Sequence, residues 1–150
     1  MESCIFCKII SGEIPSVKIW EDYNYLAFLD INPNTEGMTI LIPKKHFNSY
    51  IFDLKDIDYS EILLAAKKVG KILDKKLNVK RTALVIEGLG INHLHVKLYP
   101  LHGLKDLFEE VVSKDIVYFE KYPGYITTQL GPKKSFEELN KIAEKIKKQI

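Results

Sequence analysis

The sequence has 150 residues, of which 46% are hydrophobic, and this length and composition are typical of one globular domain. Its 22 basic and 20 acidic residues leave a formal net charge of +2, so we expect no nucleic-acid partner. Arg81 is the only arginine, so a bound phosphate must be held by backbone N–H groups, histidine, lysine or a metal ion. We see neither a signal peptide nor a long apolar run, which predicts a cytoplasmic protein without a membrane partner.

The first half of the sequence predicts a short helix, three strands and a long helix. The short helix is expected at residues 4–12, and the strands at 17–20, 25–31 and 37–42, close enough in sequence to pair as antiparallel neighbours. Asp56 or Asp58 could cap the long helix. Its core-facing residues recur at helical spacing: Ile62, Ala65, Ala66, Val69, Ile72, Leu73 and Leu77.

The second half predicts two more strands and a less regular tail. Strands are expected at 81–87 and 92–99, on either side of a glycine-containing turn. In the tail, 104–112 is predicted to be helical and 122–128 extended. A capping box, Ser135 to Glu138, opens a final helix with one apolar face, made of Leu139, Ile142, Ile146 and Ile150. This mixture of strands and helices predicts the α+β class.

The segment His93–Tyr99 (H-L-H-V-K-L-Y) alternates polar and apolar residues. On a strand, His93, His95 and Lys97 would share one face, and the apolar residues between them would fill the other. Two imidazoles and an ammonium group in a row form an electropositive strip suited to a phosphate. An exposed polar face on an edge strand would show the same alternation, so both interpretations stay open at this point.

Cys4 and Cys7 form a C-x-x-C motif. Together with His46 and His93 they make up a Cys₂His₂ set, which suits tetrahedral zinc. A redox pair, or two small buried apolar cysteines, are the alternatives. The redox alternative is disfavoured because the motif does not follow a strand that opens a βαβ unit.

These motifs, in this order, resemble the histidine-triad (HIT) superfamily, and the N-terminal part resembles its Hint-like branch. The family carries H-φ-H-φ-H-φ-φ, with φ hydrophobic, and this chain has two of the three histidines, with Lys97 in the third place. The resemblance covers residues 4–100. The segments that carry it are Cys4–Ile10 with Gly12–Pro15, Phe28–Pro33, Leu41–His46 and His93–Tyr99.

The resemblance implies an antiparallel sheet with a central helix, usually in a homodimer. It also implies an enzyme that hydrolyses or transfers nucleoside monophosphates. The middle histidine of the family attacks the α-phosphorus and becomes a nucleotidyl-histidine, and it matches His95. Asp30 matches the acid that binds the ribose hydroxyls of an AMP-like purine nucleotide. The other matching nucleotide-binding positions are Phe6, Ile9, Ile14, Phe28, Ile31 and Gly90. Simple core packing is the alternative for the five side chains that would contact the base, above all for Ile9 and Ile14.

Similar proteins bind one structural zinc ion through the residues that match Cys4, Cys7, His46 and His93. With four protein ligands, such a site has no open position for catalysis. The resemblance therefore implies a structural zinc ion, one per chain, which also fixes the His93 ring beside the nucleophile.

The chain departs from the family around the phosphate. A lysine at position 97 can stabilise phosphate charge but is a poor proton donor near neutral pH. The glutamine and serine that usually precede the triad align with Leu89 and Gly90, and Met38 stands where relatives often have histidine. The nucleoside pocket is therefore expected to be intact, whereas the phosphate machinery has changed.

The sequence is compatible with two candidate functions. The first is a phosphoramidase or another nucleotidyl hydrolase or transferase that acts through His95, with Lys97 as its second catalytic residue. The second is a non-catalytic nucleotide-binding or interaction module that keeps the zinc site. We expect residues 1–100 to form the nucleotide-binding core and residues 101–150 an extension packed on the same domain. His102 is predicted to be a solvent-exposed loop residue rather than part of the site.

Overall fold

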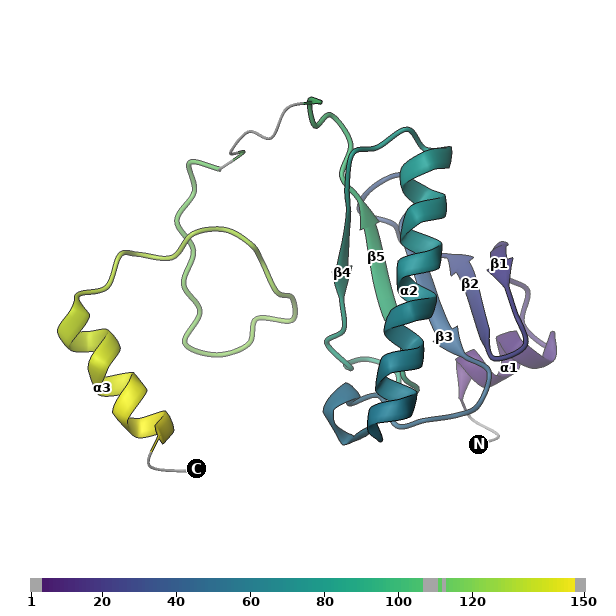
Figure 1. Cartoon of the computed structure of the whole chain (residues 1–150), viewed down its shortest axis with the longest axis horizontal. Coiled ribbons are helices and arrows are strands. Elements are labelled where there is room, and N and C mark those ends of the chain that lie inside the picture. The colour runs from purple at the N-terminus through teal and green to yellow at the C-terminus, as the bar shows by residue number, and fades with distance from the viewer. Residues whose placement is uncertain (1–3, 107–110, 112, 148–150) are drawn as a thin grey trace. The chain divides into compact units, whose positions relative to one another are not determined.

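A computed structural model describes residues 4–106, 111 and 113–147, and it divides the chain into two compact units, Met1–Asp106 and Leu107–Ile150. The first unit is a five-stranded antiparallel sheet with helices, so the α+β prediction is confirmed (Figure 1). Its elements are α1 (Ile5–Ser11), β1 (Lys18–Glu21), β2 (Tyr25–Leu29), β3 (Thr39–Pro43), the 3₁₀ helix η1 (Ile51–Asp53), α2 (Asp56–Lys76), β4 (Thr82–Val85) and β5 (Val96–Pro100).

The two faces of the sheet carry different helices (Figure 1). Because side chains alternate along a strand, each strand contributes to both faces. On one face, alternate residues of β2, β3 and β5 pack against α2, whose buried side chains include Ile62, Ala66 and Val69. On the other face, side chains of α1 and of the strands form a second buried cluster: Phe6, Ile9, Leu26, Phe28, Ile40 and Ile42. The candidate functional site lies on this α1 face.

The strand order is β1-β2-β3-β5-β4, so β5 lies inside the sheet between β3 and β4. This order excludes the edge-strand alternative for the His93–Lys97 segment. The strand begins at Val96 rather than at residue 92, so His93 and His95 lie in the segment that leads into it. The predicted alternation nevertheless holds, because Leu94, Val96 and Leu98 all join the α2-side core.

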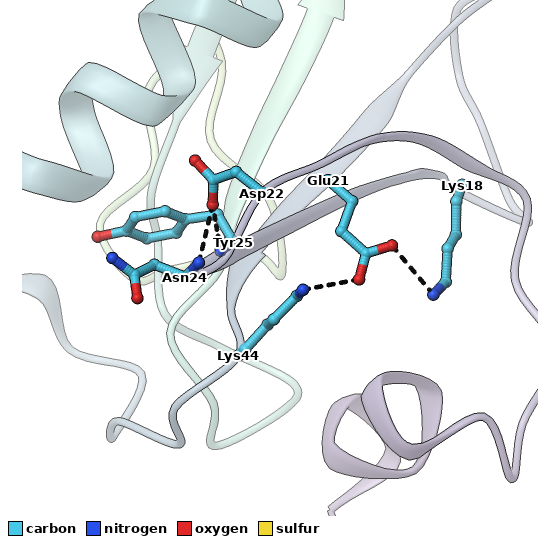
Figure 2. A network of polar contacts seen from close by, with 6 residues as sticks. All are labelled: Lys18, Glu21, Asp22, Asn24, Tyr25 and Lys44. Carbon is cyan, nitrogen blue, oxygen red and sulfur yellow. Dashed lines mark hydrogen bonds and ion pairs between the residues drawn. The ribbon is translucent and has the colours of Figure 1, made fainter.

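A polar network joins the β1–β2 turn to the end of β3 (Figure 2). Asp22 Oδ1 accepts backbone N–H groups from Asn24 at 2.9 Å and Tyr25 at 2.8 Å, which closes the turn. Glu21 then forms an ion pair with Lys44 at 2.7 Å, and the backbone N–H of Lys44 donates to the carbonyl of Asn24 at 2.7 Å. These contacts fix the segment that runs on from Lys44 to His46.

The start of α2 differs from the prediction. The N-cap is Lys55, which has no side-chain capping bond, whereas Asp56 and Asp58 both lie in the first turn. Neither aspartate is therefore the cap, but carboxylates in the first turn interact favourably with the positive end of the helix dipole. The predicted inward face is confirmed, with Ile72 and Leu77 half-buried and the other five residues buried.

The second unit contains α3 (Phe136–Lys147). Its capping box is confirmed, because Ser135 N–H donates to Glu138 Oε2 at 2.8 Å and Glu138 N–H donates to Ser135 Oγ at 3.2 Å. Leu139, Ile142 and Ile146 are all exposed. The segment 122–128, predicted to be extended, forms no strand, and nearby Val117 N–H donates to the carbonyl of Leu130.

Two tail predictions fall partly outside the described residues. Of the predicted helix at 104–112, residues 107–110 and 112 lie outside them, and residues 104–106 and 111 are not helical. Ile150 also lies outside them. The packing of 101–150 on the core stays a prediction. Within the described part of the chain, no helix is both long and apolar enough to cross a membrane.

Candidate functional site

Cys4, Cys7, His46 and His93 meet at one point, although they are far apart in sequence. Cys4 precedes α1 and Cys7 lies within it, His46 follows β3, and His93 precedes β5. Their ligand atoms all lie within 4.8 Å of one another. Cys7 Sγ lies 3.3 Å from His46 Nδ1 and 3.6 Å from His93 Nδ1, and Cys4 Sγ lies 3.5 Å from His93 Nδ1.

This donor set fits a tetrahedral metal ion. With metal–sulfur and metal–nitrogen bonds of about 2.3 and 2.0–2.1 Å, sulfur and nitrogen ligands of a tetrahedron lie about 3.6 Å apart, close to the separations observed here. The Nε2–H of His93 donates to the carbonyl of Pro43 at 2.9 Å, which directs the Nδ1 lone pair toward the thiols. Burial, with Cys4 beside it, raises the pKa of the Cys7 thiol, so a bound cation would displace a proton there.

His95 is buried with one ring nitrogen already in use. Its Nδ1–H donates to the backbone carbonyl of His93 at 2.7 Å, so the lone pair of the neutral ring lies on Nε2. Burial lowers the pKa of His95, which favours this neutral form. The Phe6 ring packs edge-on against both His93 and His95, at centroid distances of 5.8 and 5.5 Å. The arrangement leaves a fixed, neutral imidazole with a nucleophilic nitrogen.

Lys97 forms an ion pair with Glu87, a residue that the sequence analysis did not single out. The side chains are 23% and 15% exposed, respectively. The segment is less electropositive than predicted, because burial lowers the pKa of both His93 and His95 and a carboxylate balances Lys97. The alternation of side chains along the predicted strand at 81–87 is the one sequence signal that could have placed Glu87 on the same face of the sheet as Lys97.

The register of the sheet arranges the site in rows. Phe28 pairs with Ile40, Ile40 with Lys97, and Lys97 with Val85, so these four form one row across the α1 face. Two residues further along each strand, Asp30 and Tyr99 lie on the same face. Tyr99 is half-buried, which raises the pKa of its phenol, and it too was missed from sequence.

The predicted nucleoside-binding residues divide into buried and exposed groups. Phe6, Ile9 and Phe28 belong to the α1-side core, and Ile14 packs against it, so these side chains also serve packing. Ile31 is 89% exposed and is not part of this buried cluster. Asp30 is half-buried, and its Oδ1 accepts the backbone N–H of Asn32 at 2.8 Å, which sets the carboxylate at the end of β2.

The turn between β4 and His93 depends on glycine. Gly88 has a φ of +70°, and an added Cβ would lie 2.7 Å from the carbonyl oxygen of Ser49. Gly90, a predicted phosphate neighbour, has a φ of +85° and open space around it. His102 is exposed, as predicted, and its Nε2–H donates to the carbonyl of Glu36 at 3.0 Å.

Comparison with known proteins gives consistent matches. Residues 11–103 match the HIT domain. An uncharacterised HIT-like protein from Methanocaldococcus jannaschii is 39% identical over 121 residues, covering 75% of this chain and 92% of that protein. An adenosine 5'-monophosphoramidase from Candida albicans is 35% identical over 150 residues, covering 99% of this chain and 91% of the relative.

A solved structure is also similar to this chain. The zinc-bound histidine-triad family protein from Mycobacterium smegmatis has a TM-score of 0.64 and 27% identity, covering 71% of this chain and 81% of that one. With residues 11–103 matched to the domain and a relative at 39% identity, the chain belongs to the HIT family.

Proposed function

We propose that this protein is a nucleotide hydrolase or transferase that acts at the α-phosphate of a nucleoside monophosphate derivative through a nucleotidyl-His95 intermediate. The observation that carries the proposal is the hydrogen bond from His95 Nδ1–H to the carbonyl of His93, which leaves Nε2 as the nucleophile. The monophosphoramidase relative supports an AMP-like substrate with a P–N bond. We place the chain in the Hint-like branch, with Lys97 in place of the third histidine.

The chemistry follows from the geometry of His95. Nε2 attacks the α-phosphorus, the bond to the leaving group breaks, and the leaving group departs with the bonding electrons and takes up a proton from solvent. Water then attacks the nucleotidyl-histidine and loses a proton to solvent, which releases the nucleoside monophosphate and restores the neutral imidazole. Two easier displacements thereby replace one difficult one. Incubation with adenosine phosphoramidate followed by mass spectrometry tests the proposal, and an adenylyl group on His95 is the expected result.

Lys97 is proposed to stabilise the charge of the phosphate and not to act as a proton donor. Lys97→Ala should slow adduct formation by roughly 10²–10³-fold, because one charged contact to the transition state is lost. Lys97→His should help poor leaving groups most, since it restores a titratable group. Single-turnover kinetics with matched good and poor leaving groups measures both effects. The exposed Lys68 on α2 provides the control as Lys68→Ala, and equal rates for Lys97→Ala and the parent would contradict the role.

Asp30 is proposed to bind the ribose hydroxyls. Asp30→Ala should weaken AMP binding by about 1.5–3 kcal/mol, because a charge-assisted hydrogen bond is lost. Asp30→Asn is the sharper variant, since its side-chain oxygen can still accept the Asn32 N–H that shapes the turn. Calorimetry with AMP measures both variants. If both bind AMP as tightly as the parent, Asp30 does not hold the ribose.

The rest of the nucleotide site and the metal complete the proposal. Phe6, Phe28, Ile9, Ile14 and Ile31 would hold a purine base, and Gly90 would lie beside the phosphate. A structural zinc ion would be held by Cys4, Cys7, His46 and His93, where the separations of the donor atoms support it. When bound, it would tie the N-terminus and the segments before β5 together around the nucleophile. We further propose a cytoplasmic homodimer, with residues 101–150 packed on the same domain as the core.

A non-catalytic nucleotide-binding module is the second candidate. It is favoured by the Lys97–Glu87 pair, because a lysine already held by a carboxylate is less available to a phosphate than the third histidine of the family would be. Binding of AMP without any turnover or adduct would support this alternative.

A further inference from the structure

Glu87 introduces a negative charge into the phosphate side of the site. It follows β4 on the α1 face, and its carboxylate contacts the Lys97 ammonium. At 15% and 23% side-chain exposure, the two charges are mostly shielded from solvent. Charges in such surroundings interact more strongly than charges on the surface, because less water screens them.

The position of Glu87 brings this charge close to a nucleotide phosphate. Val85 pairs with Lys97, so Glu87, two residues further along the chain, continues past β4 toward His95. The fields of Lys97 and Glu87 both act on His95, in opposite directions. A phosphate at His95 Nε2 would therefore meet an ammonium that is already balanced by a carboxylate. Asp30 lies on the same face, so the side chains of Lys97, Glu87 and Asp30 together carry a net negative charge.

We propose that Glu87 selects ligands by their charge. The site binds a nucleoside monophosphate, or its amide, and Glu87 disfavours a nucleotide with a second phosphate group. This inference rests on the proposed function, because it requires the α-phosphate to lie at His95. A β-phosphate would add negative charge beside the Glu87 carboxylate, and the Lys97 ammonium that could offset this charge already pairs with Glu87. An interaction of this kind changes a binding constant by tenfold or more.

Calorimetry of the full chain with AMP and with α,β-methylene-ADP tests the proposal. The methylene compound carries the added phosphate but cannot be cleaved between its two phosphorus atoms. The parent should bind AMP more tightly. In Glu87→Gln the preference for AMP should fall by about tenfold, mainly through tighter binding of the methylene-ADP. Glu87→Asp keeps the charge and should keep the preference.

Glu21→Gln is the matched control, because Glu21 also pairs with lysines but lies in β1, at the opposite edge of the sheet from β4. It should leave both affinities unchanged. A second measurement needs no variant: raising the salt concentration should reduce the preference of the parent, since the discrimination is electrostatic. This keeps the test valid if Glu87→Gln folds poorly.

The outcomes separate this inference from the proposed function. An unchanged preference in folded Glu87→Gln, an equal loss of both ligands, or a preference that salt does not affect would overturn the role of Glu87. Equal binding of both ligands by the parent would also overturn it. A folded parent that binds neither ligand would instead reject the proposed nucleotide site.

Discussion

Replacing His95 with alanine is expected to abolish turnover of adenosine phosphoramidate and the covalent nucleotidyl adduct together. The expected loss in kcat is about 10⁴-fold or more, the size of effect that follows when a nucleophile is removed. The neighbouring His93 cannot replace it, because His93 directs its Nδ1 toward the thiols and donates its Nε2–H to the carbonyl of Pro43. Steady-state kinetics and intact-mass spectrometry on the same preparation measure both effects.

His102→Ala is the matched control for this experiment, because His102 is an exposed loop histidine bonded only to a backbone carbonyl in the contacts described. It should leave turnover and adduct unchanged. Undiminished turnover in His95→Ala would exclude the covalent mechanism. A parent that binds AMP but gives neither turnover nor adduct would favour the binding-module function.

Much of the fold could be predicted because its elements follow strong local patterns. The inward face of α2 repeats at helical spacing over more than four turns, so its buried residues were identified in advance. The strands were placed to within a few residues, but their ends depend on pairing that sequence does not reveal. The segment 92–95 alternates like a strand, yet pairing to β3 begins only at Val96. The predicted N-cap of α2 was wrong for a related reason, since a side chain that can cap a helix, such as that of Asp56 or Asp58, need not occupy the cap position.

The site was predicted less completely than the fold. The cysteines and histidines were grouped from residue types and family resemblance, and the structure brings all four together. Glu87 and Tyr99 were missed because their importance depends on register across the sheet. Only the pairing of Val85 with Lys97 and of Ala83 with Tyr99 shows which side chains lie on the same face of the sheet as Lys97. The carboxylate that balances Lys97 was missed for the same reason, since it lies ten residues away in sequence.

Removing the metal is expected to destabilise the core more than any single substitution on its surface. We predict one zinc ion per chain in protein purified without added metal, and structural zinc can contribute on the order of 10 kcal/mol of apparent binding free energy. Chelation, Cys4→Ala and His46→Ala should each lower the melting temperature sharply. Elemental analysis and calorimetric melting of the same samples provide the measurements.

The pH dependence gives this prediction a second readout. Burial raises the pKa of the Cys7 thiol, so in the metal-free protein the thiol is protonated near neutral pH and zinc must displace that proton. Zinc affinity should therefore rise with pH and fall as the solution is acidified, with protons released on binding. His102→Ala, which removes a histidine outside the cluster, should retain the metal. A metal-free, fully folded parent whose Cys4→Ala variant melts at the same temperature would exclude a structural zinc ion. The cluster would then be held by protein contacts, among them the packing of Phe6 against His93 and the His93–Pro43 hydrogen bond.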